Sequence, residues 1–273
     1  MRCASDVPVE VAPWRAAVAI ALDVGLLCAW WWHPWLWRQV TIWLHVLSMT
    51  GSASAVDLTV TLAVMAGARL TWAKLGLTPR QLAAALAIAG ATWAANQLVQ
   101  WIDVAWTGAS VAQWVDVPGA LLNAYGEELL CRLVLIGGLT TLLSRRMPAA
   151  RAVRWAVVIA TLIFAASHLP HDLAQGQIHH LERYPALLGF GLLMSLVYLQ
   201  TGNLMIGALL HVLLNEPVLI IAGPHADMVT VAMVWIASGA VIAVQAWRRR
   251  STPATGWRGA GPRAGRRARR AGR

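Results

Sequence analysis

Long blocks of apolar residues alternate with short polar segments along most of the chain. Each block is roughly twenty residues long, which is the length that a helix needs to cross a bilayer core of about 30 Å. The pattern therefore predicts an all-α polytopic membrane helix bundle. We expect eight transmembrane helices, at Ala16–Trp32, Thr41–Ala66, Gln81–Ile102, Pro118–Leu143, Val153–His168, Pro185–Gln200, Asn203–Ile221 and Met228–Trp247.

The composition agrees with this pattern. Of the 273 residues, 58% are hydrophobic and only 12% are charged, which is about half the charged share of a soluble domain. The three cysteines form no CxxC pair and no even-numbered framework. A cytosolic globule, a disordered chain and a secreted disulfide scaffold are therefore excluded.

The net charge of +10 arises at the C-terminal end. Residues 248–273 contain ten Arg and no acid, so the rest of the chain is electrically balanced. We expect a disordered basic tail that is attracted to the lipid bilayer, and no nucleic-acid partner, because no folded basic module accompanies it. The expected organisation is a two-helix region at 1–74, a core at 75–247 and an Arg-rich cytoplasmic tail at 248–273.

Basic residues also mark the short loops. With eight spans, one side of the membrane receives the tail and the two loop clusters Arg69, Lys74 and Arg80, and Arg145, Arg146, Arg151 and Arg154. Positive charge in short loops favours the cytoplasmic side. We therefore expect both termini in the cytoplasm.

The fourth predicted span contains three charged residues, Glu127, Glu128 and Arg132. In a helix, Glu128 and Arg132 stand four positions apart with the acid first, which favours an ion pair. Glu127 points about 100° away from Glu128 and is left without this partner. The cluster is either a buried ionic device for helix packing or a site in which Glu127 acts as a general base toward water.

Two further predicted spans carry polar groups within apolar surroundings. His168 lies one turn after Phe164 and two residues before Pro170, which should end the helix. His211 and Asn215 are four residues apart and share one helix face. Considered alone, His168 would be an ordinary interfacial histidine, and His211 with Asn215 would be polar groups that stabilise helix packing. Together they suit amide hydrolysis, in which Glu127 takes a proton from water and His or Asn donors hold the oxyanion.

Three ordered motifs then indicate a family. Glu127 to Arg132 reads EExxxR, Phe164 to His168 reads FxxxH, and His211 to Asn215 reads HxxxN. In this order they resemble the CPBP (Abi) family of intramembrane proteases, which includes the type II CAAX prenyl endopeptidases. Leu75-Gly76-Leu77 and Gly202-Asn203-Leu204 add to the similarity, which covers about Leu75–Pro217.

The resemblance implies an intramembrane endopeptidase with its centre in a cavity within the bilayer. By motif, Glu127 would be the general base, and Glu128, Arg132 and Phe164 its structural support. His168 would help to orient the water, and His211 with Asn215 would stabilise the oxyanion. We expect an integral protein of a bacterial inner membrane that acts on a membrane-embedded protein or peptide.

Two alternatives stay open. Glu127, His168 and His211 could furnish a zinc site with an open water position, although no HExxH pair accompanies them, and we expect no obligate metal or other cofactor. The chain could also be an inactive scaffold or a bacteriocin-immunity protein of the same fold. The sequence does not indicate the substrate or whether it is prenylated.

Overall fold

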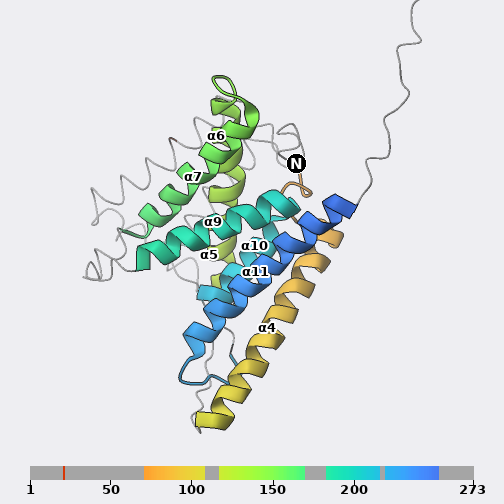
Figure 1. Ribbon diagram of the computed structural model, residues 1–273, viewed down its shortest axis with the longest axis vertical. Helices are drawn as coiled ribbons and strands as arrows, with labels where there is room; N and C mark the ends of the chain where they lie inside the picture. Colours follow the sequence, from red (N-terminus) through yellow and green to blue (C-terminus); the bar gives the residue numbers. More distant parts are fainter. Residues whose placement is uncertain (1–20, 22–70, 108–116, 170–182, 216–218, 252–273) are drawn as a thin grey trace, which may run out of the picture.

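The computed structural model describes residues 21, 71–107, 117–169, 183–215 and 219–251. Every secondary-structure element within these residues is helical (Figure 1), which confirms the predicted fold class for this part of the chain. The elements are α4 (Pro79–Thr107), α5 (Val117–Glu128), a π-helical segment η2 (Leu129–Ile136), α6 (Gly137–Leu143), α7 (Ala149–Ser167), α9 (Arg183–Thr201), α10 (Leu204–Asn215) and α11 (Ala226–Ser251).

Four of these helices, α4, α7, α9 and α11, are long and apolar enough to cross a membrane. The segments α5, η2 and α6 follow one another without a break, because Glu128 and Gly137 keep right-handed helical dihedral angles at the two junctions. Together they cover the predicted fourth span. The first two predicted spans lie outside the described residues, apart from the helical residue Ala21, so the number of eight spans stays a prediction.

Two helix boundaries differ from those predicted. The seventh predicted span, Asn203–Ile221, contains α10 from Leu204 to Asn215, and its described residues 219–221 are not helical. The sequence reason is Pro217, since a helix usually ends before the residue that precedes a proline. At the other end of the core, α11 continues to Ser251 and so includes the first residues of the predicted tail. Residues 252–273 lie outside the described part of the chain.

Helix α4 shows why this bundle belongs in a lipid environment. Its buried positions are Ala85, Thr92, Asn96 and Gln100, whereas its exposed large residues are Leu86, Leu98, Trp101, Ile102 and Trp106. Polar groups thus face the interior and apolar groups face outward, the reverse of a soluble helix. Buried Gln100 donates a hydrogen bond to the carbonyl of Ala226 and accepts one from the N–H of Gly223, at 3.1 and 3.0 Å.

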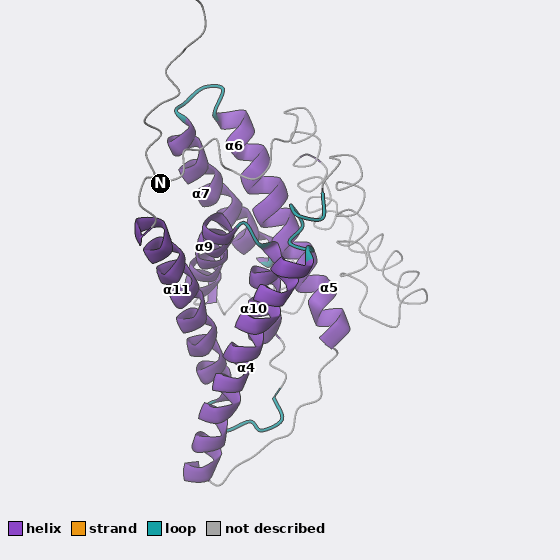
Figure 2. Cartoon of the chain, turned by 90° about the vertical axis from the view of Figure 1, so that its right-hand side faces the viewer, coloured by secondary structure: helices purple, strands orange, loops and turns teal. Residues whose placement is uncertain are grey.

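Helix α10 lies in the centre of the bundle in both views (Figures 1 and 2), in contact with α4, α5, α9 and α11. The largest hydrophobic core combines fully buried residues of η2, α7, α9 and α10, namely Leu135, Phe164, Met194 and Leu210. Burying each such side chain contributes roughly 1.5–3 kcal/mol in a soluble protein. In lipid the benefit comes from close packing instead. The core thereby fixes the side chains of α10 against those of α5 and η2.

The short segments Leu75-Gly76-Leu77 and Gly202-Asn203-Leu204 meet at the start of this central helix. Asn203 caps α10, since its Oδ1 accepts the N–H of Met205 at 3.1 Å, and its Nδ2 donates to the carbonyl of Gln81 at 2.9 Å. Gly76 has φ +75°, and a Cβ at this position would lie 2.8 Å from Asn203 Oδ1. Only glycine permits so close an approach here. The junction therefore ties the start of α4 to the start of α10.

Candidate active site

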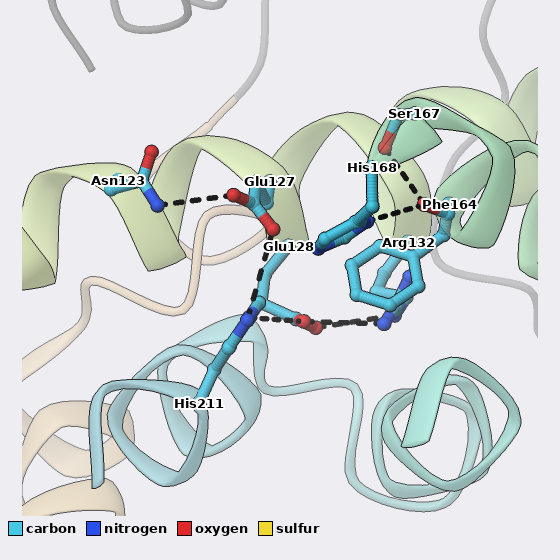
Figure 3. A network of polar contacts seen from close by, with 8 residues as sticks. All are labelled: Asn123, Glu127, Glu128, Arg132, Phe164, Ser167, His168 and His211. Atoms are coloured by element: carbon cyan, nitrogen blue, oxygen red, sulfur yellow. Dashed lines mark hydrogen bonds and ion pairs between the residues drawn. The ribbon is translucent and has the colours of Figure 1, made fainter. Parts of the chain in front are cut away.

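The two adjacent glutamates stand where α5 passes into the π-helical segment η2 (Figure 3). A π-helical stretch inside a longer helix is frequent at functional sites, because it re-aims the side chains around it. Arg132 lies in η2 and is completely buried. The expected pairing of Arg132 with Glu128 is present in the structure, and the side chain of Glu128 is only 1% exposed.

Glu128 is held from two helices. Arg132 reaches both of its oxygens, with Nη2 donating to Oε1 and Nε 3.2 Å from Oε2. From α10, the Nδ1–H of His211 donates to Oε1 at 3.1 Å. A Cβ on Gly207, one turn before His211, would lie 3.0 Å from Oε2, so a glycine here allows α10 to approach the carboxylate closely. Glu128 is thus a buried, ion-paired group at the contact of α5, η2 and α10, with hydrogen bonds to Oε1 and only the ion-pair contact with Arg132 at Oε2.

Glu127 has a different environment, although it is the neighbouring residue. Its side chain is 25% exposed, and Asn123 Nδ2 donates to its Oε1 at 3.0 Å. The other oxygen, Oε2, is buried and accepts no hydrogen bond from the described residues. It lies 3.7 Å from His211 Nε2, which is too long for a hydrogen bond. Glu127 therefore presents one buried and unsatisfied carboxylate oxygen beside an imidazole.

His211 links the two carboxylates. It is 2% exposed, with Nδ1 toward Glu128 and Nε2 toward Glu127. Its ring packs against Phe190 with the centroids 4.9 Å apart and against Phe164 at 6.1 Å, in edge-to-face arrangements. Because a carboxylate only accepts hydrogen bonds, the contact with Glu128 places a proton on Nδ1.

Phe164 is the centre of the aromatic packing around the charges. The guanidinium of Arg132 lies 5.1 Å from its ring centroid, and the His168 ring meets its edge at 4.9 Å. His168 follows the last residue of α7, and its Nδ1–H donates to the carbonyl of Phe164 at 2.9 Å. In a neutral imidazole this bond places the proton on Nδ1 and leaves Nε2 unprotonated. The FxxxH spacing thus serves both packing and orientation.

Asn215 is the predicted site residue that the structure does not bring into this cluster. It is the last residue of α10, and its side chain is exposed. Four residues earlier, on the same helix, His211 is buried against both glutamates. No hydrogen bond joins the Asn215 side chain to any other residue that the structure describes.

The residues proposed for zinc do not form a ligand set in the described part of the chain. No group of three His, Cys, Asp or Glu side chains within it has a metal-holding arrangement. Glu127 and His211 approach one another, with Oε2 3.7 Å from Nε2, but no third candidate ligand joins them among these residues. The His-containing segment 170–182 lies outside the described residues. We therefore derive no step through a metal.

Two residues of this site are not singled out by the motifs. Asn123 lies four residues before Glu127 and Gly207 four residues before His211, so each shares a helix face with a motif residue. That spacing is a signal that the sequence contains. What it does not contain is the rotation of α5 against α10, which decides that Gly207 meets Glu128.

Comparison with known proteins agrees with the motifs. Residues 110–216 match the family model described as Type II CAAX prenyl endopeptidase Rce1-like. No curated protein and no solved structure matches the chain. The matched region contains Glu127, Glu128, Arg132, His168 and His211, and with the apolar helices it supports an integral membrane protein.

Proposed function

Because residues 110–216 relate this chain to the CPBP and CAAX proteases, we propose that it is an intramembrane endopeptidase in which Glu127 activates water. The observation that carries the proposal is the difference between the two adjacent carboxylates. Glu128 is ion-paired with Arg132 and accepts a hydrogen bond from His211. Oε2 of each glutamate is buried without a hydrogen bond from the described residues, but that of Glu128 lies 3.2 Å from the Arg132 guanidinium, whereas that of Glu127 has no Arg or Lys beside it and is the oxygen that could accept a proton from water.

In the proposed reaction, Glu127 Oε2 accepts a proton from water as the hydroxide attacks the carbonyl carbon of the scissile peptide bond. The resulting oxyanion needs donors that are already in place. His211 and Asn215 are the proposed donors, and His168 is proposed to orient the water. Because the Nδ1–H of His211 is already donated to Glu128, His211 can donate to the oxyanion only through a second proton on Nε2. When the C–N bond breaks, Glu127 returns the proton to the leaving nitrogen. The products are a carboxylic acid, which keeps the second proton of the water, and an amine, and the enzyme is unchanged.

Glu128 and Arg132 have a structural task in this proposal. Their ion pair fixes the side chain of His211 and the contact between α5 and α10. Because removal of either partner would leave an unpaired charge in the interior, both residues are needed for the fold. The ion pair also keeps the neighbouring Glu127 at a fixed distance from His211.

The proposal is tested by comparing peptides released from membranes of cells that express the wild-type protein or Glu127→Ala. We expect a set of peptides that accumulates only with the wild type, and the residues at their ends identify the cleaved bond. Glu128→Gln, scaled to its folded amount, is the matched control for loss of one carboxylate. Identical peptide sets for the wild type and Glu127→Ala would favour the second candidate, an inactive scaffold or immunity protein.

A further inference from the structure

We propose that Asn123 is a positioning residue, which holds Glu127 in the orientation that activates water. The inference rests on the proposed function, because it gives Asn123 a task only if Glu127 is the general base. Asn123 lies on α5, one helical turn before Glu127 and outside the three family motifs. It touches neither carboxylate oxygen of Glu128 in the described contacts.

The geometry separates the two oxygens of Glu127 (Figure 3). Asn123 Nδ2 donates to Oε1 at 3.0 Å, and this oxygen faces away from α10. Oε2 is left on the side of His211, 3.7 Å from Nε2. One donor thus ties one oxygen, and the other oxygen stays available as an acceptor. This is the arrangement that a general base needs, since its free lone pair must point at the water.

The orientation of the Glu127 carboxylate depends on this one hydrogen bond, whereas Glu128 has several partners. Arg132 and His211 engage Glu128 from two directions, whereas the hydrogen bond from Asn123 is the only one that the described residues provide to Glu127. A glutamate side chain has several rotatable bonds and is a quarter exposed here, so without a partner it samples several rotamers. Some of them would direct both oxygens away from the position of the water. The hydrogen bond from the Asn123 amide selects a single rotamer of the Glu127 side chain.

A role limited to helix stability predicts a different outcome from positioning. If Asn123 only supported α5, its loss would lower the folded fraction and leave the turnover of each folded molecule unchanged. If it orients Glu127, its loss lowers kcat in folded protein. KM should stay the same, because Asn123 makes no contact that holds the substrate in the proposed reaction.

The test measures kcat and KM of the full-length protein in detergent micelles with an internally quenched farnesylated peptide and with its non-farnesylated counterpart. For Asn123→Ala we expect kcat to fall on the order of 10- to 100-fold, the usual effect of a misplaced catalytic group, with KM changed less than about twofold. Asn123→Asp keeps the shape but loses the donor, and should fall at least as far. Asn123→Gln keeps an amide and should restore part of the loss.

Tyr125→Phe is the matched control on the same helix. It removes the hydrogen bond from Tyr125 to the carbonyl of Leu75, 3.1 Å long, which ties α5 to another part of the bundle without touching Glu127. We expect its kcat to equal that of the wild type. Equal losses in Tyr125→Phe and Asn123→Ala, or a wild-type kcat in Asn123→Ala, would overturn the positioning role.

A second measurement needs no substrate and separates this inference from the proposed function. The infrared difference spectrum between the wild type and Glu127→Gln isolates the carboxylate bands of Glu127. Asn123→Ala should shift these bands, because one oxygen loses its hydrogen bond, and Tyr125→Phe should not. Unshifted bands in Asn123→Ala would refute the hydrogen bond between Asn123 and Glu127. Shifted bands combined with full activity in Glu127→Gln would instead refute the general-base function and with it the task of Asn123.

Discussion

Glu127 and Glu128 show how two identical, adjacent side chains acquire different tasks from their surroundings. Glu128 is enclosed and bound by Arg132 and His211. Glu127 points to another side of the helix and is partly exposed, with one unsatisfied oxygen. Neutralising Glu128 should therefore mainly lower stability, and neutralising Glu127 should mainly lower turnover.

Replacement of Glu128 tests the structural half of this difference. Glu128→Gln leaves the fully buried guanidinium of Arg132 without its counter-charge, which should lower the free energy of unfolding by about 3 to 5 kcal/mol. Glu127→Gln leaves the ion pair of Arg132 intact and should change the free energy of unfolding by less than about 1 kcal/mol. Unfolding in denaturing detergent, with the yield of monodisperse protein, measures both. Equal stability of the two variants would contradict the assignment.

His211 and Asn215 distinguish the metal-free reaction from a zinc reaction. Without metal, loss of an oxyanion donor should lower turnover by about 10² to 10³-fold while substrate affinity changes little. Asn215→Ala and His211→Ala should then both behave in this way. With zinc, His211→Ala should strip metal from the purified protein and Asn215→Ala should not. Metal analysis of both variants, with activity measured in chelator, decides between them, and full activity of Asn215→Ala would remove it from the site.

The sequence predicts those contacts of the site that lie within one helix. The pairing of Glu128 with Arg132 and the contact of Phe164 with His168 follow from four-residue spacings. The contact between His211 and Glu128 joins residues 83 positions apart. Such a contact depends on how far each helix is rotated about its axis, which the spacing along one helix does not fix. The motif order indicated that these groups belong together, but not which atoms meet.

Among the helices, the junction between the starts of α4 and α10 positions the site most directly. The backbone of Gly76 has φ +75° and lies against Asn203, the cap of α10. A side chain here would face both an unfavourable backbone conformation and a steric clash. The junction therefore depends on the absence of a Cβ at one residue.

This dependence gives a pair of matched glycine substitutions. Gly76→Ala should lower the free energy of unfolding by about 1 to 3 kcal/mol, because the added methyl group would meet Asn203 and the N–H of Leu204. Gly90→Ala, in the middle of α4 with open space around it, should be neutral or stabilising by up to about 1 kcal/mol. Thermal unfolding of both variants measures the difference. A loss in Gly90→Ala as large as in Gly76→Ala would show that the junction has no special role.

The positions of the helices could be predicted from the sequence, but the type of helix within each segment could not. Apolar length located the helical segments of the described core, because bilayer thickness imposes it. The π-helical segment at Leu129–Ile136 was not predicted. Its hydrogen bonds span one residue more than those of an α-helix, and a continuous apolar run carries no mark of this change. Residues 219–221 are not helical, although the prediction included them. Pro217 in the sequence disfavours a helix through this region, but the prediction followed the continuous apolar run.

Across the whole molecule, charge is divided between the two ends of the bundle. In both views the connection from α6 to α7, the start of α4 and the end of α11 lie toward one end (Figures 1 and 2), and these segments carry Lys74, Arg80, Arg145, Arg146, Arg151, Arg154 and Arg248–Arg250. The opposite end holds Asp103, which contacts His225 at 3.1 Å just before α11. This division is what the positive-inside rule requires of an integral membrane protein.

Reporter fusions test the resulting orientation. Fusions placed after Arg80, Arg154 and Arg250 should all report the cytoplasm, since each follows a basic segment at the same end of the bundle. A fusion after Thr107, at the far end of α4, should report the opposite side and serves as the internal control. A periplasmic signal at Arg154 would reverse the orientation. Cytoplasmic signals at both Arg80 and Thr107 would show that α4 does not cross the membrane.

The measurement that bears most directly on the proposed endopeptidase is the turnover of Glu127→Gln beside that of the wild type, at equal concentrations of folded protein. The substrate is a peptide bond identified by the comparison of released membrane peptides. We expect turnover to fall on the order of 100-fold or more, because the general base is lost, while the unfolding transition stays in place. Wild-type turnover in folded Glu127→Gln would contradict the account.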